Sequence, residues 1–337
     1  GKTVVLLHRA RRLAQKYPNE TIGILTLNRS LAKLLRQLID ELCLDGENER
    51  IKVDAYYDYF QSILRELGTE EYLKECIRTL PANHSMQVAL STALKYHKNL
   101  ANDFDPIGSE SLDDTWREFW TDHVNDDHHT EQAKAQLIQK LKGDFDTEAY
   151  IRDEFTLIRS AFSREKRTSQ YDDGYYGYER NGRCITFNEV PRKNVLTLLL
   201  RYEEVMISGA MLDESGLAQV MMPYIAKLRK LPDHLQRRCL LIDEFQDFST
   251  LELRLLKQIP NSQENGLFLT GDTVQKIMVK DFNLGVALLD RNYVRTCVIK
   301  KNYRNSRQIL TAAHALVESY RNSATATDKS IEILNPE

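Results

Sequence analysis

An apolar run that leads directly into adjacent carboxylates limits the possible folds of this chain more than any other feature. Cys239–Ile242 reads CLLI, and Asp243 and Glu244 follow it at once. Four consecutive apolar residues are typical of a short strand buried on both faces, as in a parallel sheet covered by helices. Carboxylates at the end of such a strand suit a metal-binding acid and a base that activates water. A solvated acidic turn would explain one or two carboxylates, but not the ordered motifs that flank them.

The first three residues, Gly1-Lys2-Thr3, match the last part of a phosphate-binding loop, whose full pattern is GxxxxGK[ST]. They precede an apolar segment suited to a helix, and backbone N–H groups at a helix start bind phosphate oxygens. In this arrangement Lys2 reaches the β- and γ-phosphates and Thr3 holds Mg²⁺. Three residues recur by chance, so the motif gains weight from Asp243 as the metal carboxylate and Glu244 as the base. Together these residues predict a site for ATP and Mg²⁺.

Two further motifs follow predicted strands. The run Leu267–Thr270 leads into the sequence GDTVQ, where Gln275 is expected to sense the γ-phosphate. The run Val294–Ile299 precedes the sequence NYRNS. There, Arg304 can act as an arginine finger on the γ-phosphate and Tyr303 can stack on a nucleobase. Taken singly, each motif leaves a simple turn or a surface charge open as the alternative interpretation.

The order of the predicted elements indicates one α/β unit with a helical insertion. Short apolar strands at 22–27 and 51–55 enclose a helical pattern at 31–42, in which apolar residues recur every three to four positions. Helical patterns then dominate from about 68 to 163 and return at 194–231, ahead of the later strands. Strands that alternate with helices at both ends favour a parallel sheet, and the helical middle is predicted to be an insertion.

The charge of the chain is unevenly distributed. The formal net charge is −3, so the chain is not a uniformly basic nucleic-acid binder. Residues 101–131 hold ten acidic side chains and one basic side chain, which leaves a charge of +6 on the rest of the chain. We expect this tract to be a solvated acidic surface, with a docking site for a basic partner as the alternative. A metal site at Asp126–His129 is a weaker hypothesis, because adjacent ligands on a polar loop are poor evidence.

The sequence shows no sign of membrane insertion or secretion. No apolar run approaches the roughly 18 residues that a membrane helix needs, and the N-terminal residues lack the cleavage site of a secretory signal. The five cysteines include no CxxC pair, which is typical of reduced thiols in the cytosol. We therefore expect a cytoplasmic protein without a membrane segment.

Five segments in this order resemble the motifs of the UvrD/Rep-like superfamily 1 DNA helicases: GKT, ILTLNRSLAKLLRQLI, LLIDEFQDFS, LFLTGDTVQ and NYRNSRQIL. The resemblance covers roughly residues 1–60 and 195–320. It implies an α/β fold, a RecA-like P-loop NTPase lobe with a parallel sheet, interrupted by a mostly helical inserted domain. It also implies hydrolysis of ATP between two RecA-like lobes and movement along single-stranded DNA, usually from 3′ to 5′.

The same resemblance divides the chain into four parts. We expect residues 1–66 to form the first part of the ATPase lobe, 67–190 the inserted helical domain and 191–300 the second part of the lobe. Residues 301–337 would begin a second RecA-like lobe. Because the other motifs of the family lie outside this segment, we expect the segment alone to hydrolyse ATP poorly and to unwind no duplex.

The resemblance also implies roles for individual residues. Gln246 and Gln275 are similar to the polar side chains that couple to the phosphates. Tyr303 is similar to the tyrosine that stacks on adenine, and Arg304 to the first arginine finger. Contacts to the nucleic-acid backbone are implied for Asn28 and Arg29. An aromatic segment that lines the strand channel is implied for Tyr56, Tyr57 and Phe60.

The chain departs from the family pattern at several positions. Leu27 stands where the family has Thr, and Asp58 stands where it has His. After GDTVQ, Lys280-Asp281 replaces an Arg-Gly pair that stacks against bases in the family. These changes indicate a divergent member with altered handling of the strand.

Basic and aromatic residues elsewhere suggest a second place for nucleic acid. Arg167, Arg192 and the tyrosines of the stretch YDDGYYGY, among them Tyr175, would suit a groove in which bases stack. Solvated helix faces and a structural tyrosine loop are the alternative. Trp116 and Trp120 are spaced four apart on one helix face, and we expect them to belong to a packed core.

Three functions remain open from the sequence. The first is an ATP-dependent translocase or helicase on single-stranded DNA, with RNA as an open alternative because contacts to the phosphate backbone carry no sugar specificity. The second is a UvrD-like ATPase that serves as a sensor or regulatory subunit of a nuclease or defence complex, without processive unwinding. The third is a catalytically silent binding module, which the complete set of predicted catalytic residues argues against.

Overall fold

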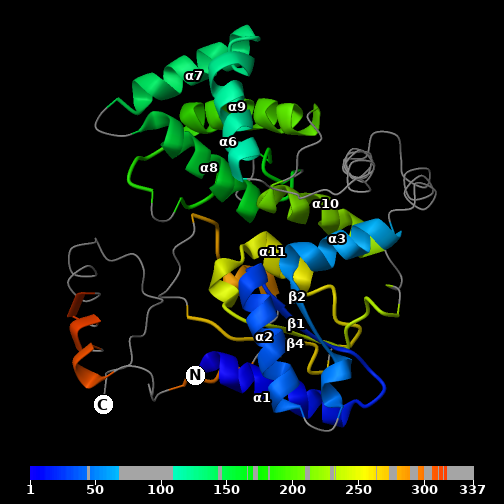
Figure 1. Cartoon of the computed structure of the whole chain (residues 1–337). Helices are drawn as coiled ribbons and strands as arrows, with labels where there is room; N and C mark the ends of the chain where they lie inside the picture. Colours follow the sequence, from blue (N-terminus) through cyan, green and yellow to red (C-terminus); the bar gives the residue numbers. More distant parts are fainter. Residues whose placement is uncertain are drawn as a thin grey trace.

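The computed structural model combines a helix-covered parallel sheet with a second unit whose described residues form helices and loops (Figure 1). It describes residues 1–43, 46–67, 109–142, 146–164, 166–169, 174–180, 183–208, 213–227, 231, 233–262, 264–272, 279–288, 295–299, 306–309, 311–313 and 315–316. Within these ranges, no helix has both the length and the apolar character needed to cross a membrane.

Four parallel strands form the sheet in the order β2-β1-β3-β4. In the middle, Ile22 of β1 pairs with Ile51 of β2 on one side and with Cys239 of β3 on the other. At the next position, Leu240 of β3 pairs with Leu267 of β4. The chain therefore leaves the sheet after β2 and returns beside β1, which confirms the predicted α/β fold. The strands are β1 (Ile22–Thr26), β2 (Ile51–Ala55), β3 (Cys239–Ile242) and β4 (Leu267–Leu269).

Helices cover both faces of the sheet, which explains why all residues of β1 and β3 are buried. On one face, Leu6 of α1 packs in a cluster with Ile24 and Leu241. On the other face, Phe60 of α3 packs in a cluster with Leu240. Neighbouring residues of a strand thus enter different cores, as expected for a sheet with two buried faces. The helices of this lobe are α1 (Lys2–Lys16), α2 (Arg29–Leu42), α3 (Tyr56–Leu67), α10 (Glu214–Lys227), α11 (Thr250–Leu256) and α12 (Leu284–Leu288).

The helical unit has its own aromatic core. The Trp116 ring packs edge-on against Phe155 and Tyr202, with centroids 5.6 and 5.4 Å apart. Trp120 stacks on Trp116 at 5.9 Å, which confirms that both tryptophans belong to a core. Side chains of α9 pack in the same core. The predicted domain boundaries stay a prediction. The elements are α6 (Ser109–Glu118), the π-helical turn η2 (Phe119–His123), α7 (His128–Lys140), α8 (Thr147–Ala161) and α9 (Glu189–Ser208).

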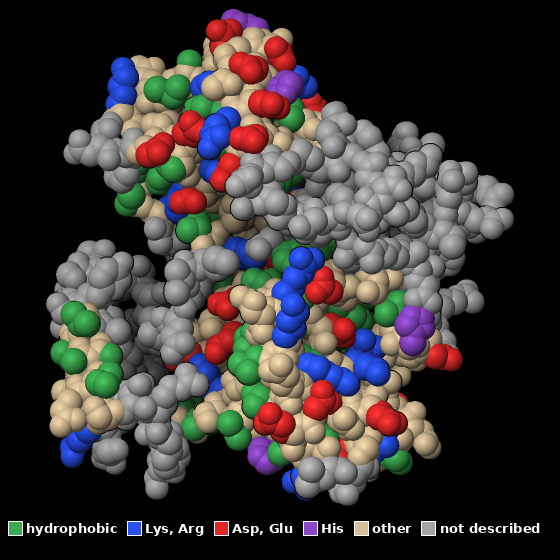
Figure 2. All heavy atoms as spheres, in the orientation of Figure 1, with side chains coloured by type: hydrophobic (Ala, Val, Ile, Leu, Met, Phe, Trp, Pro, Cys, Tyr) green, Lys and Arg blue, Asp and Glu red, His purple; other side chains and the backbone are tan. Residues whose placement is uncertain are grey.

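Acidic side chains gather on the outside of the helical unit (Figure 2). The side chains of Asp114 and Glu131 are 64% and 60% exposed, as expected for a solvated acidic surface. Asp127 caps α7, because its carboxylate accepts a hydrogen bond from the Thr130 N–H at 3.2 Å. Residues 101–108 of the acidic tract lie outside the described residues.

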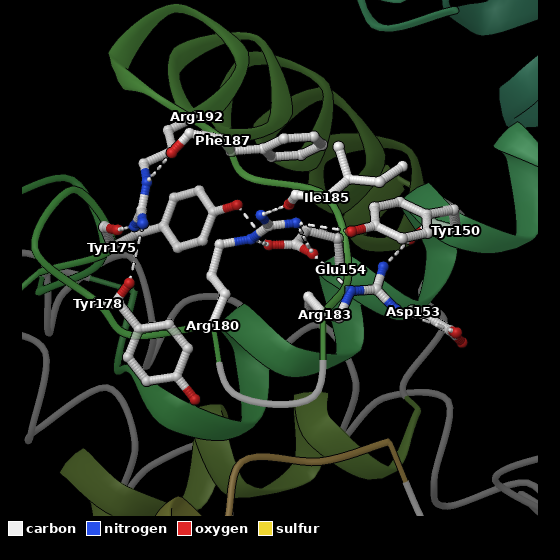
Figure 3. A network of polar contacts seen from close by, with 10 residues as sticks. All are labelled: Tyr150, Asp153, Glu154, Tyr175, Tyr178, Arg180, Arg183, Ile185, Phe187 and Arg192. Atoms are coloured by element: carbon white, nitrogen blue, oxygen red, sulfur yellow. Dashed lines mark hydrogen bonds and ion pairs between the residues drawn. The ribbon is translucent and has the colours of Figure 1, made fainter. Parts of the chain in front are cut away.

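One buried carboxylate, that of Glu154, ties the tyrosine-rich stretch into the helical unit (Figure 3). Arg180 donates to both of its oxygens, at 2.6 and 2.8 Å, and the Tyr175 hydroxyl donates at 2.5 Å. Tyr175 is fully buried and so has no face open to a base. Arg167 is also buried and donates to Glu203 at 2.7 Å. The predicted stacking groove is therefore wrong at these residues, and the structural alternative is confirmed.

The predicted strand at Val294–Ile299 is wrong in its described part. Residues 295–299 are not part of the sheet, and Val298 and Ile299 are 59% and 49% exposed. An apolar run becomes a strand only where a neighbouring strand pairs with its N–H and C=O groups, and within the described residues no strand does so here. Val294 itself lies outside the described residues.

Candidate active site

The predicted phosphate loop and the strand-end carboxylate meet in space. The hydroxyl of Thr3 donates a hydrogen bond to Oδ2 of Asp243 at 3.0 Å, across 240 residues of sequence. Thr3 lies in the first turn of α1, and Asp243 follows β3, where its N–H donates to the carbonyl of Leu25 in β1 at 3.1 Å. Asp243 is only 1% exposed, so its carboxylate depends on such partners in place of water.

The second oxygen of Asp243 is held from the neighbouring strand. The hydroxyl of Thr270, the residue after β4, donates to Oδ1 at 2.7 Å. The backbone N–H of Glu244 donates to the same oxygen at 3.2 Å. The carboxylate is therefore bound from α1, from β4 and from its own loop.

Glu244 adopts a left-handed backbone conformation, at the point where the chain turns away from β3 into a short helix. Its φ and ψ are both 50°, in the left-handed region. For a residue with a side chain, such a conformation costs of order 1–3 kcal/mol, and strained residues of this kind cluster at active sites. The turn leads into the short 3-10 helix η3 (Phe245–Asp247) and leaves the Glu244 side chain 32% exposed. A base that activates water needs this access to solvent.

Gln246 connects the acidic loop after β3 with the GDTVQ loop after β4. Its Nε2 donates to Oε2 of Glu244 at 2.9 Å, and its Oε1 accepts from the N–H of Asp272 at 2.8 Å. Gly271 is required for this approach, since a Cβ atom there would lie 2.3 Å from Oε1 of Gln246. The glycine of the GDTVQ motif thus allows the two loops to pack together.

Lys2 lies between two carboxylates at the mouth of the site. Its Nζ is 3.9 Å from Oε2 of Glu244 and 4.0 Å from Oδ2 of Asp272. Both pairs are partly exposed, and pairs of this kind contribute little stability. Lys2 also begins α1 without a side-chain cap, so N–H groups of the first turn are available to a ligand. Phosphate oxygens can therefore replace the carboxylates around Lys2.

These motifs and their arrangement agree with a comparison against protein families. A family model for the UvrD/REP helicase N-terminal domain matches residues 1–279, which is more than half of the chain. The chain belongs to the UvrD/REP helicase family. Membership confirms the resemblance inferred from the five sequence motifs and the RecA-like character of the sheet.

Two curated proteins share shorter regions with this UvrD/REP domain. TPR and ankyrin repeat-containing protein 1 of Homo sapiens is 31% identical over 159 residues, which is 42% of this chain and 5% of that protein. An ATP-dependent helicase/nuclease subunit of Lactobacillus acidophilus is 27% identical over 94 residues, 25% of this chain and 8% of that protein. The matched regions are thus a small part of either relative.

The residues of the UvrD/REP domain fit a Mg²⁺ ion. Thr3 and Asp243 offer hard oxygen ligands side by side, and Oδ2 of Asp243 has one lone pair beyond that used by Thr3. A bound Mg²⁺ would neutralise the charge of the phosphates. Among the described residues, no group of three His, Cys, Asp or Glu side chains is placed to hold a metal, the acidic and histidine-rich turn at 126–129 included. Mg²⁺ usually binds through one or two carboxylates together with substrate phosphates.

Three predicted catalytic or nucleotide-binding residues fall outside the described part of the chain. They are Gln275, Tyr303 and Arg304. The residues that the structure brings together are Lys2, Thr3, Asp243, Glu244 and Gln246. The roles of both groups in catalysis stay predictions.

The residues predicted to contact nucleic acid occupy two different environments. Asn28 caps α2, and its side-chain oxygen accepts from the N–H groups of Ser30 and Leu31 at 2.7 and 3.2 Å. Arg29 is half exposed and pairs with Asp58, with Nη2 and Oδ1 2.9 Å apart. The three aromatic residues predicted to line the strand channel lie at the start of α3. Tyr56 and Phe60 are fully buried there, and Tyr57 is partly buried. Their contact with a strand stays a prediction.

Sequence reasoning missed Thr270 and Asp281 as parts of this region. The sequence pattern marks Thr270 only as the end of a strand, although a hydroxyl where an apolar run ends beside a predicted metal site is a usable signal. Asp281 stands out in the sequence only as a departure from the family pattern, and its partners could not be predicted, because Ser160, Tyr178 and Thr250 lie between 31 and 121 residues away.

Proposed function

We propose that the chain is the nucleotide-binding part of an ATP-dependent translocase or helicase that moves along single-stranded DNA from 3′ to 5′. The contact of Thr3 with Asp243, beside Lys2 and Glu244, carries the proposal. It joins a phosphate-binding helix start, a metal carboxylate and a base within one site. The proposal includes a cytoplasmic location, ATP and Mg²⁺ as ligands, and hydrolysis between this lobe and a second RecA-like lobe.

Each residue of the site has a defined task in this proposal. Lys2 and the N–H groups of the first turn of α1 bind the phosphates of ATP. Thr3 and Asp243 hold Mg²⁺. Glu244 accepts a proton from the water that attacks the γ-phosphorus, and the bond from that phosphorus to the bridging oxygen of ADP breaks. Gln246 keeps the Glu244 carboxylate in place through its 2.9 Å hydrogen bond.

Substitution of the base tests the ATPase half of the proposal in the full-length protein. Glu244→Gln is expected to lower ATP turnover by roughly 100-fold or more, since general base catalysis contributes about 10²–10⁴-fold. Binding of a fluorescent ATP analogue should persist. The exposed Glu41→Gln on α2 is the matched control and should turn over ATP at the wild-type rate. An undiminished rate for Glu244→Gln would refute the assigned base.

Strand specificity and polarity need separate measurements. ATP hydrolysis is expected to rise on addition of single-stranded DNA, and unwinding should require a 3′ tail on the duplex. A matched RNA oligonucleotide tests the sugar preference, because the 2′-hydroxyl is the group that distinguishes the two polymers. Stimulation by RNA alone, or unwinding that requires a 5′ tail, would contradict the proposal.

A regulatory ATPase without processive unwinding is the second candidate function. Two observations favour it: Tyr56 and Phe60 are buried, and Lys280 and Asp281 bind residues of the chain itself, Glu252 at 3.4 Å and Thr250 at 2.5 Å. These positions supply contacts to the strand in the family pattern. A nuclease-like protein partner would fit this role, as in the relative that is named a helicase/nuclease subunit. DNA-stimulated hydrolysis without unwinding of any tailed duplex would support it.

A further inference from the structure

Thr270 is a buried polar residue between the acidic loop after β3 and the GDTVQ loop after β4. It is 8% exposed and is the last residue before Gly271. Its backbone is held on both sides, because its N–H donates to the Ile242 carbonyl at 2.9 Å and its carbonyl accepts from the Phe245 N–H at 3.0 Å. The backbone of Thr270 is therefore held by the end of β3 and by the turn that follows β3.

The Thr270 hydroxyl has one proton and two acceptors within reach. Oδ1 of Asp243 lies at 2.7 Å and the carbonyl oxygen of Ile242 at 3.3 Å. A hydrogen bond to a carboxylate is shorter and about twice as strong as one between neutral groups. The distances agree with this difference, so the proton goes to Asp243.

The hydrogen bonds to the Asp243 carboxylate leave one lone pair of its oxygens unused. Each oxygen of a carboxylate has about two lone-pair directions. Oδ1 accepts from Thr270 at 2.7 Å and from the Glu244 N–H at 3.2 Å, and is therefore fully used. Oδ2 accepts only from Thr3, at 3.0 Å, in the described structure. The remaining lone pair thus belongs to the oxygen beside Thr3, where the cation of the proposed function would be held.

We infer that Thr270 is a positioning residue for the divalent cation, which it serves by fixing the rotation of the Asp243 carboxylate. The terminal torsion of an Asp side chain is broad, and without Thr270 the oxygen Oδ1 would be held only by the Glu244 N–H at 3.2 Å, so the carboxylate could turn about its bond to Thr3. Thr270 prevents this rotation and keeps Oδ2 toward Thr3. The inference rests on the proposed function, because it assumes that Thr3 and Asp243 bind a cation together with a nucleotide.

Three substitutions separate the hydroxyl from the shape of the side chain. Thr270→Val keeps the branched shape and removes the hydroxyl, whereas Thr270→Ser keeps the hydroxyl and removes the methyl group. If Thr270→Val does not fold, as judged by circular dichroism and thermal melting, Thr270→Ala removes the same hydroxyl without a new methyl group. The measurement is the affinity for Mn²⁺ in the presence of ADP, followed by the electron paramagnetic resonance signal of free Mn²⁺.

We expect Thr270→Val to weaken Mn²⁺ binding by roughly 10-fold or more, as is typical when a partner of a metal ligand is removed. Thr270→Ser should bind Mn²⁺ within about 3-fold of the wild type, since the charge-assisted hydrogen bond is kept. The affinity for nucleotide in the presence of EDTA should be unchanged in all variants. This last measurement distinguishes loss of the cation from general damage to the site.

Two results would overturn the inference while leaving the proposed function intact. The first is wild-type Mn²⁺ affinity in Thr270→Val. The second is an equal loss in Thr270→Ser and Thr270→Val, which would mean that packing alone matters. If the wild-type chain bound no Mn²⁺ with ADP, the proposed function would fail together with this inference.

Discussion

The hydroxyl of Tyr178 donates a hydrogen bond to the carboxylate of Asp281, which lies 103 residues further along the chain. Tyr178 belongs to the loop of the helical unit, and Asp281 lies after the GDTVQ loop of the ATPase lobe. The same Asp281 binds Ser160 of α8 through its N–H, at 2.7 Å, and accepts from the Thr250 hydroxyl of α11 at 2.5 Å. Burial and the nearby Asp281 raise the pKa of Tyr178, so the hydroxyl stays protonated. Asp281 therefore connects the helical unit to the ATPase lobe through hydrogen bonds to both.

Removal of the Tyr178 hydroxyl should weaken the connection between the helical unit and the ATPase lobe. We expect Tyr178→Phe to lower the free energy of unfolding by about 1.5–3 kcal/mol, the usual contribution of a hydrogen bond to a charged group. Urea denaturation measures the change. Tyr176→Phe in the same loop is the matched control and should change the free energy by less than about 0.5 kcal/mol. Equal effects of the two substitutions would show that the bond to Asp281 adds no stability.

The buried Glu154 should make the stability of the chain depend on pH. Burial alone would raise the pKa of Glu154, but the hydrogen bond and the charge of Arg180 outweigh it and hold the pKa below the ordinary value of 4.5. A carboxylate with a lowered pKa in the folded state stabilises the fold above its unfolded-state pKa. This stability is lost as the pH falls from about 4.5 through the lower folded pKa.

Glu154→Gln tests this effect. At neutral pH the substitution should destabilise the chain by about 3–5 kcal/mol, because Arg180 keeps its charge in a buried place without a counter-charge. As the pH falls through 4.5 and below, the free energy of unfolding should fall less steeply than in the wild type. Glu204→Gln, at a side chain that is 59% exposed, is the control. A slope identical to that of the wild type would contradict the assignment of the titration to Glu154.

The pair of Arg29 with Asp58 leads to a prediction about nucleic acid. If Arg29 contacts a phosphate, Arg29→Ala should weaken the binding of single-stranded DNA and reduce the salt dependence of log K by about one. Asp58→Asn should strengthen binding, because it removes the carboxylate 2.9 Å from the Arg29 guanidinium. Fluorescence anisotropy at several salt concentrations measures both. Arg12→Ala, at an exposed position on α1, is the control, and an equal loss there would indicate unspecific attraction.

The close packing of Gly271 against Gln246 predicts a cost for any side chain at this position. Gly271→Ala places a Cβ atom 2.3 Å from Oε1 of Gln246 and 2.5 Å from the Phe245 ring. We expect a loss of about 1–3 kcal/mol in the free energy of unfolding, as for other overpacked sites. Combination with Gln246→Ala should cost less than the sum of the two single changes, because part of the clash is gone. Strict additivity in thermal or urea denaturation would contradict this explanation.

The sequence by itself determined the sheet, the helix start at Lys2 and the strand-end carboxylates. These features depend on local patterns: the run CLLI is apolar at every position because both faces of β3 are buried, and in α2 the apolar Leu35 and Ile39 lie on the buried face, although Leu34 is 49% exposed. The same local rules failed at 295–299, since an apolar run does not specify whether a strand lies beside it.

Only the tertiary structure decided how the polar residues are paired. Thr270 and Asp243 are 27 residues apart, and Tyr178 and Asp281 are 103 apart, so no periodicity along the chain marks either pair. Tertiary structure also decided that Tyr56 and Phe60 lie in the core, although their place in the sequence suggested a strand channel. A hydrogen bond or a buried ring depends on where another segment lies in space, and that position is set by the packing of the whole lobe.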